Sequence, residues 1–301
     1  MNLSVKIGQS VFPNPVTVAS GTFGHAEEFY RQEEVRSLGA IVPKTVTLNA
    51  RQGNPPRRIC ETPAGMINAI GIENPGLDVF VAEKLPLLKG VGVPVIVSIS
   101  AGSPDEFALM AEKLNAAGGL AAVELNLSCP NLQKKVLVAQ SEDATTEVVR
   151  RVKAVCHYPV IAKLTPNVTD IVAIALAAEA AGADAVSLVN TFAAMAIDIK
   201  KRRSRIGNFT GGLSGPAIRP IAVRMVCETA ARVKVPVIGM GGITCADDAL
   251  EFLIAGATMV AVGTYNFVNP RAPLEVLNGI KAYLKANKMT DIRELIGSIQ
   301  R

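Results

Sequence analysis

The residues with the clearest chemical potential lie in segment 125–131, Leu-Asn-Leu-Ser-Cys-Pro-Asn. This segment follows an apolar run, 121–125, that is typical of a buried strand, and it ends in the breaker pair Pro130-Asn131. A thiol, Cys129, and a carboxamide, Asn126, therefore stand where a strand gives way to a loop. A cysteine at such a place can act as an acid or base, although most free cysteines are simply small buried apolar side chains. The residues at the ends of the other expected strands favour a role in acid–base chemistry for Cys129.

Several other expected strands also end in polar or glycine-rich clusters. These clusters are Ser20-Gly21, Lys44-Thr45, Ser98 with Ser100, Lys163, Asn190-Thr191, Gly241-Gly242 and Gly263-Thr264. A glycine pair by itself more often marks a tight turn. Glycines at two consecutive strand ends, each opening toward a helix, let backbone N–H groups approach a phosphate. The loop 211–216, Gly-Gly-Leu-Ser-Gly-Pro, adds another donor-rich turn before a helix.

Lys44 and Lys163 each end a strand that is otherwise apolar. Burying an unpaired ammonium group is costly, so a lysine there needs a partner or a route to solvent. Two lysines at the same edge as a phosphate site indicate an anionic ligand.

These residues must be positioned by alternating strands and helices. Eight short apolar or β-branched runs are expected to be strands: 16–20, 40–45, 94–100, 121–128, 159–165, 185–191, 236–242 and 259–264. Helical patterns separate them, so the strands should be parallel. Eight strand–helix units predict an α/β protein with a (β/α)8 TIM barrel, with a doubly wound open sheet as the competing topology.

Three helices stand out by pattern. The spacing predicts a helix over 169–181 with Thr169 as N-cap and Gly182 just past its end. Two more are expected over 104–117 and 244–255, the latter capped by Thr244.

Length and composition predict one domain spanning 1–301. Hydrophobic residues make up 49% of the chain and tryptophan is absent, which suits strands buried on both faces. No linker or shift in composition divides the sequence. The segments 46–90 and 192–215 exceed ordinary connections and are expected to be active-site insertions.

Cysteine usage and hydropathy suggest a cytoplasmic protein. Five cysteines with no C-x-x-C spacing argue against a disulfide framework, a zinc ribbon or an iron–sulfur cluster, and no metal site is expected. The first residues lack the apolar core of a signal peptide. The longest uncharged run, 252–270, is broken by glycines and by Asn269-Pro270, so it should be a helix end, a strand and a loop rather than a membrane span.

The net charge of +5 equals the five positive charges of segment 200–205, Lys-Lys-Arg-Arg-Ser-Arg. Such a run can bind nucleic acid. Without interleaved aromatic residues, a solvated loop or a site for an anionic ligand is the better interpretation.

Over almost its whole length the sequence resembles dihydroorotate dehydrogenases, the FMN-dependent enzymes of pyrimidine synthesis, and within them the catalytic subunit of class 1B. The resemblance rests on matches in the same order along the chain: 19–24 (ASGTFG), 43–47 (PKTVT), 53–58 (GNPPRR), 62–71 (TPAGMINAIG), 74–76 (NPG), 126–131 (NLSCPN), Asn190-Thr191, 210–216 (TGGLSGP) and 239–243 (GMGGI).

The resemblance implies a barrel that holds FMN at the carboxyl ends of its strands, with dihydroorotate stacked on the flavin. The residues that meet the flavin would be Ser20, Lys44, Thr45, Asn126 and Lys163. The ribityl phosphate would be held by Gly215, Gly241, Gly242, Gly263 and Thr264. Dihydroorotate would be held by Lys44, Asn68, Ala69, Ile70, Gly71, Ile72, Asn126, Asn190 and Thr191, and Cys129 would be the catalytic base.

The implied reaction explains these residue types. Oxidising dihydroorotate to orotate removes a proton from C5 and a hydride from C6. The hydride goes to flavin N5, so the base Cys129 must stand on the opposite side of the substrate ring. Carboxamides bind the imide without adding charge, and Lys163 would stabilise the negative charge that reduced flavin gathers near N1. One departure is the segment 132–140, which has no glycine where relatives have a glycine-rich mobile loop.

Class 1B implies that electrons pass to NAD+ through a partner subunit that carries FAD and a [2Fe-2S] cluster. Two barrels and two partners would form a heterotetramer around a barrel homodimer. Class 1A, a homodimer that uses fumarate, is the alternative within the family. Class 2 is disfavoured, because its base is serine and its helical extension precedes a first strand that here begins near Val16.

Two alternatives lie outside this enzyme family. A tRNA dihydrouridine synthase also has a Cys-Pro after a strand, but it appends a helical RNA-binding domain, and only 37 residues follow Thr264. A non-catalytic barrel would be expected to lose the base or the phosphate glycines, and this sequence keeps both.

Overall fold

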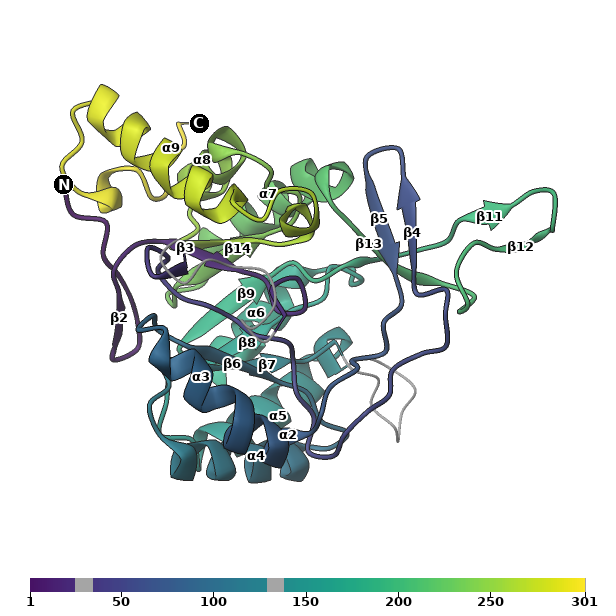
Figure 1. Cartoon of the computed structure of the whole chain (residues 1–301). Coiled ribbons are helices and arrows are strands. Elements are labelled where there is room, and N and C mark those ends of the chain that lie inside the picture. The colour runs from purple at the N-terminus through teal and green to yellow at the C-terminus, as the bar shows by residue number, and fades with distance from the viewer. Residues whose placement is uncertain (25–34, 129–137, 301) are drawn as a thin grey trace.

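The computed structural model describes residues 1–24, 35–128 and 138–300. Its centre is a curled parallel sheet of seven strands in the order β3-β15-β14-β9-β8-β7-β6 (Figure 1). The strands are β3 (Val16–Val18), β6 (Ile96–Ile99), β7 (Ala122–Asn126), β8 (Val160–Lys163), β9 (Ala185–Leu188), β14 (Val237–Met240) and β15 (Met259–Val262). Nearly every strand residue is buried, which explains the continuous apolar runs in the sequence.

Segment 39–46 supplies the eighth strand position and closes the barrel. Parallel bridges from Ile41 and Val46 join it to the β6 side. On its other side, Gly39 N–H donates to the carbonyl of Val16 in β3 at 2.8 Å. Each expected strand run therefore contributes at its predicted place. The (β/α)8 barrel is confirmed, and the open doubly wound sheet was the wrong alternative.

Helices surround the barrel, with α3, α4 and α5 below the sheet and α7, α8 and α9 above it in Figure 1. The helix bounds are α2 (Leu77–Val79), a π-helical turn (Phe80–Lys84), α3 (Leu85–Gly90), α4 (Pro104–Ala117), α5 (Glu142–Lys153), α6 (Ile171–Ala180), α7 (Arg219–Ala230), α8 (Ala246–Ile254) and α9 (Ala272–Ala286). Short 3₁₀ helices cover Val138–Gln140, Pro216–Ile218, Thr264–Phe267 and Ile292–Glu294. None of the helices in the described ranges is long and apolar enough to span a bilayer.

The predicted helix caps need two corrections. Helix α6 is capped by Asp170 rather than Thr169, because the Asp170 carboxylate accepts from the N–H groups of the second and third helical residues. Helix α8 has Cys245 rather than Thr244 at the N-cap position, and the carboxylate of Asp248 reaches back to bind both residues. Gly182 follows α6 at φ 97°, as its place after the helix predicted.

Both insertions add structure at the carboxyl ends of the barrel strands. Strands from segments 46–90 and 192–215 form an antiparallel sheet in the order β10-β13-β5-β4. Its members are β4 (Ile59–Thr62), β5 (Gly65–Asn68), β10 (Phe192–Ala194) and β13 (Gly211–Ser214). The hairpin of β11 (Ile197–Asp198) and β12 (Arg203–Ser204) carries the basic run and projects from the molecule in Figure 1.

The amino-terminal hairpin, β1 (Val5–Ile7) with β2 (Ser10–Phe12), lies away from that sheet. Asn2 N–H donates to the carbonyl of Thr290 at 2.7 Å, so the two ends of the chain meet on the side opposite the projecting hairpin (Figure 1).

Candidate active site

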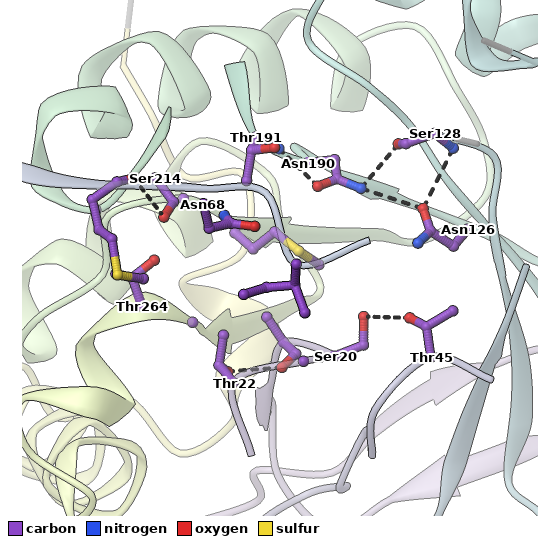
Figure 2. A pocket seen from close by; sticks show the side chains of 18 of the residues that line it. Ser20, Thr22, Thr45, Asn68, Asn126, Ser128, Asn190, Thr191, Ser214 and Thr264 are labelled. Atoms are coloured by element: carbon purple, nitrogen blue, oxygen red, sulfur yellow. Dashed lines mark hydrogen bonds between the residues drawn. The ribbon is translucent and has the colours of Figure 1, made fainter. Parts of the chain in front are cut away.

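A cavity of about 570 Å³ opens at the carboxyl ends of the strands, between the barrel and the insertion sheet. Its size falls within the roughly 300–1,000 Å³ typical of ligand and cofactor sites. Figure 2 shows labelled side chains from separate strands and loops facing this common space. The structure brings together most of the residues that the sequence singled out: Ser20, Lys44, Thr45, Asn68, Ile70, Gly71, Ile72, Asn126, Lys163, Asn190, Thr191, Gly215, Gly241, Gly242, Gly263 and Thr264.

Two predicted site residues are not placed in this lining. Ala69 lies between two lining residues but is not itself one. Its N–H donates to the Arg58 carbonyl at 2.7 Å, and its carbonyl accepts from Asn54 Nδ2 at 2.9 Å. Cys129 lies outside the described residues, and its chain neighbour Ser128 lines the cavity.

One wall of the cavity is a carboxamide and hydroxyl network. Asn190 Nδ2 donates to Asn126 Oδ1 at 3.3 Å and to Ser128 Oγ at 2.9 Å. Asn190 Oδ1 in turn accepts from the N–H of Thr191 at 2.8 Å (Figure 2). These contacts fix which end of each carboxamide donates, so the wall offers oriented donors and acceptors without net charge.

A second network joins residues of four other strand positions. Thr45 Oγ1 lies 2.9 Å from Ser98 Oγ and 3.3 Å from Ser20 Oγ. Ser20 also accepts from Lys163 Nζ at 3.2 Å. The predicted cofactor residues Ser20, Thr45 and Lys163 therefore form one connected set.

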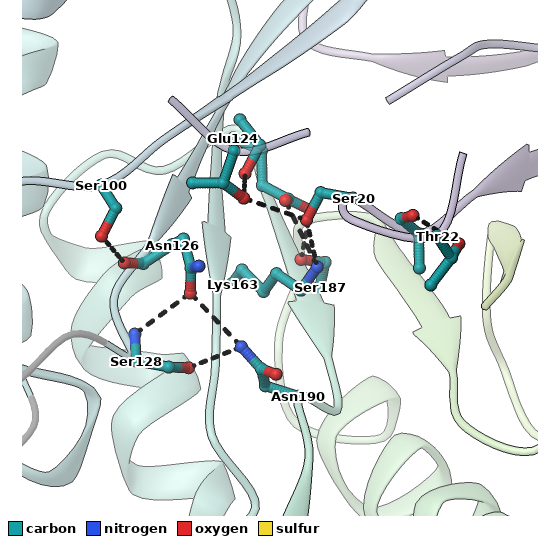
Figure 3. Close-up of polar contacts among 12 residues, drawn as sticks. Ser20, Thr22, Ser100, Glu124, Asn126, Ser128, Lys163, Ser187 and Asn190 are labelled. Carbon is teal, nitrogen blue, oxygen red and sulfur yellow. Dashed lines mark hydrogen bonds and ion pairs between the residues drawn. The ribbon is translucent and has the colours of Figure 1, made fainter. Parts of the chain in front are cut away.

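Lys163 belongs to a buried ion pair. Its Nζ lies 3.4 Å from Glu124 Oε1, and the two side chains are only 5% and 4% exposed. Glu124 Oε2 also accepts from Ser187 Oγ at 3.3 Å (Figure 3). Lys163 lines the cavity, whereas Glu124 stands behind it in the barrel interior.

Lys44 is the second cation of the cavity. Among the described residues its ammonium group has no hydrogen-bond or ion-pair partner. Burial lowers the pKa of Lys44 from its ordinary value, Glu73 opposes that shift, and Lys163 adds to it. Gly21 leaves room for the ammonium group, since a Cβ there would stand 3.2 Å from Lys44 Nζ.

Three glycines form a close cradle at one end of the cavity. Gly215, Gly241 and Gly242 have φ values of 99°, 130° and 80°, which L side chains rarely adopt. A Cβ on Gly242 would stand 2.8 Å from the Gly215 carbonyl oxygen, and one on Gly215 would stand 2.7 Å from the Cα of Gly65. This bare backbone suits a phosphate group.

The helix after Gly242 already carries a carboxylate at its start. Asp248 Oδ2 accepts from the N–H groups of Thr244 at 2.7 Å and Cys245 at 3.2 Å. The start of α8 is thus occupied by its own carboxylate, which also pairs with Arg219. The N–H groups of Thr244 and Cys245 are therefore already hydrogen-bonded within the chain.

Sequence reasoning missed four functional candidates. Glu124 and Ser187 lie inside runs interpreted as strands, and their signal was a polar residue within an otherwise apolar strand. Glu73 and Phe267 line the cavity. Glu73 could have been found because it directly follows the predicted substrate segment, whereas nothing in the sequence marked Phe267.

Comparisons with known proteins agree with this geometry. The family model described as dihydroorotate dehydrogenase matches residues 2–284. A protein of Desulforudis audaxviator named dihydroorotate dehydrogenase B (NAD(+)), catalytic subunit, is 52% identical over 299 residues, which cover 99% of this chain and 97% of the relative. A protein of the same name from Thermoanaerobacter pseudethanolicus is 50% identical over 301 residues, covering 100% of this chain and 99% of the relative. The chain therefore belongs to the dihydroorotate dehydrogenase family.

Proposed function

We propose that this chain oxidises (S)-dihydroorotate to orotate in pyrimidine synthesis, as the FMN-binding catalytic subunit of an NAD+-linked enzyme. The observation that carries the proposal is the cavity, in which the chain assembles nearly all of its predicted cofactor and substrate residues. Family membership and the names of the full-length relatives support the same reaction. Membership also removes the tRNA-modifying alternative.

The cradle and the lysine side of the cavity suit the two ends of FMN. Gly215, Gly241 and Gly242 would hold its phosphate with backbone N–H groups, helped by Gly263 and Thr264. Ser20, Lys44, Thr45, Asn126 and Lys163 would meet its ring. FMN, when bound, supplies the two-electron redox chemistry, and the protein supplies binding, orientation and electrostatics.

The carboxamide wall and Lys44 suit the substrate. Asn68, Asn126 and Asn190 would bind polar groups of the pyrimidine ring, and Thr191 and the segment 70–72 would line its edge. Lys44 would neutralise the carboxylate of dihydroorotate. Dihydroorotate would then be the anionic ligand that the two lysines led us to expect.

Cys129 would accept the C5 proton. Its chain neighbour Ser128 lines the cavity and bonds to Asn190, which ties this end of the segment to the substrate wall. An ordinary thiol has a pKa near 8.5, so only a few per cent is thiolate at neutral pH. We therefore expect the rate to rise with pH until the thiol titrates.

Electron exit to NAD+ requires a second protein. The sequence has no C-x-x-C spacing to hold a cluster, so FAD and a [2Fe-2S] cluster would reside on a partner subunit. Two barrels and two partners would form a heterotetramer in the cytoplasm. The name of the relatives, a catalytic subunit, supports the existence of a partner.

The direct test is anaerobic reduction of the purified holoprotein by dihydroorotate. We expect a yellow protein with one FMN per chain, whose visible absorbance bleaches when dihydroorotate is added. Dihydrouracil, which lacks the carboxylate, is the matched control and should bleach it far more slowly. A folded protein that takes up no FMN, or a flavin that dihydroorotate leaves oxidised, would contradict the proposal.

A further inference from the structure

Glu124 is a buried carboxylate with no role in the proposed chemistry. It lies in β7, which pairs in parallel with β8, where Lys163 is located. The side chains of Glu124 and Lys163 are 4% and 5% exposed, with 3.4 Å between Oε1 and Nζ. Two charges this deeply buried are screened little by water or salt.

The contacts around the pair are asymmetric. Lys163 reaches forward to Ser20 at the cavity, while Glu124 reaches back to Ser187 Oγ at 3.3 Å (Figure 3). Lys163 therefore presents its ammonium group to the cavity with a counter-charge fixed behind it. The lysine and its carboxylate together carry no net charge.

We propose that Glu124 tunes the redox potential of the bound flavin by offsetting the positive charge of Lys163. The inference rests on the proposed function, because it requires FMN beside Lys163. A two-electron reduction adds negative charge to the flavin, and a nearby positive charge stabilises the reduced form. The Glu124 carboxylate weakens that stabilisation and holds the potential lower than Lys163 alone would set it. Glu124 is a tuning residue, since its charge acts on the flavin from behind Lys163 without lining the cavity.

The test is a reductive titration of the holoprotein against a reference dye. Glu124→Gln keeps the shape and the acceptor for Ser187 but removes the charge. We expect its reduced-to-oxidised flavin ratio at a fixed potential to rise at least tenfold, which is about 30 mV for a two-electron couple. Lys163→Met should shift the potential in the opposite direction, and the double variant should return close to wild type.

Three comparisons make the result decisive. Glu112→Gln, the same change at an exposed site on α4, should leave the potential unchanged. Ser187→Ala removes the hydrogen bond to Glu124 but no charge, so its shift should be smaller than that of Glu124→Gln. If Glu124→Gln fails to fold, the double variant compared with Lys163→Met isolates the same charge, since removing both partners of a buried pair is tolerated better than removing one.

The outcomes distinguish a failure of the proposed function from a failure of the inference about Glu124. A wild-type protein without FMN would overturn the proposed function and this inference with it. The inference alone would be overturned by a different result. In that case the wild-type protein holds FMN and is bleached by dihydroorotate, but the flavin potential of Glu124→Gln is equal to or below that of wild type.

Discussion

At the scale of single residues, the strongest prediction concerns Cys129. Cys129→Ala should retain FMN but slow flavin reduction by dihydroorotate by roughly 10²–10⁴-fold, the usual contribution of a general base. Cys129→Ser should be nearly as slow near pH 7 and recover at high pH, because a hydroxyl deprotonates less readily than a thiol. Stopped-flow bleaching measures both. An alanine variant that keeps about a third or more of the wild-type rate would remove Cys129 from the mechanism.

Lys44 should make the binding of orotate depend on pH. In the proposed function its charged form would bind the orotate carboxylate, and burial lowers the pKa of Lys44 from its ordinary value. As pH rises through this lowered pKa, the ammonium charge is lost and the Kd for orotate should increase.

The measurement is a titration of the flavin absorbance with orotate, made in a Cys129→Ala background so that the thiol of Cys129 does not titrate in the same range. Lys44→Met should bind orotate more weakly at neutral pH and show a flat pH profile. A wild-type Kd that stays constant up to the ordinary lysine pKa of about 10.4 would argue against this role.

Residues at strand ends were predictable because the barrel collects them at one rim whatever their distance in the sequence. Lys163 and Asn190, 27 positions apart, both line the same cavity. Glu124 was not predictable as a partner of Lys163. Sequence shows that a charged residue interrupts a strand, but which side chain neutralises it depends on the register between neighbouring strands.

At the scale of elements, the glycine cradle gives a sharp test. Gly242→Ala places a methyl group 2.8 Å from the Gly215 carbonyl oxygen, at a φ of 80° that alanine adopts poorly. We expect the Kd for FMN to rise at least tenfold, measured by the fluorescence of released flavin.

The matched control is Gly92→Ala. Gly92 has nearly the same φ, 78°, but nothing lies within 4 Å of the position that an alanine methyl group would take there. It shares the backbone strain without the contact, so it should cost roughly 1 kcal/mol of stability and leave FMN affinity unchanged. Equal flavin loss in the two variants would show that strain alone, not the cradle, is responsible.

Elements were predictable to different degrees for physical reasons. The barrel strands were found because burial on both faces demands continuous apolar runs. The predicted N-caps of α6 and α8 were each one residue too early. At each helix start, adjacent side chains can accept hydrogen bonds from the same N–H groups, so the sequence does not show which of them is the cap. For the insertion sheet, the sequence predicted only that segments 46–90 and 192–215 are insertions and did not predict their strands. Strands β5 and β13 are short, contain glycine and pair across 144 positions, so no local pattern marks them.

At the scale of the whole molecule, we propose that the chain is one domain. The main buried core runs from Val5 to Leu295 without a break between barrel and helices. The insertion sheet has its own small cluster of Cys60, Ile67 and Ile206, which Leu213 packs against together with the main core. The sheet that covers the cavity is thereby fixed to the barrel that forms its floor.

The last prediction concerns where electrons leave the molecule. The sequence offers FMN-binding residues but no C-x-x-C spacing and no second nucleotide fingerprint, so FMN should be its only redox centre. With dihydroorotate the isolated chain should reduce artificial dyes or oxygen, while NAD+ reduction should stay near background. Adding a partner that carries FAD and a [2Fe-2S] cluster should restore NAD+ reduction, and the Cys129→Ala barrel with the same partner should not. Rapid NAD+ reduction by the chain alone would contradict the need for a partner. Efficient turnover with fumarate by the chain alone would instead assign it to the homodimeric class.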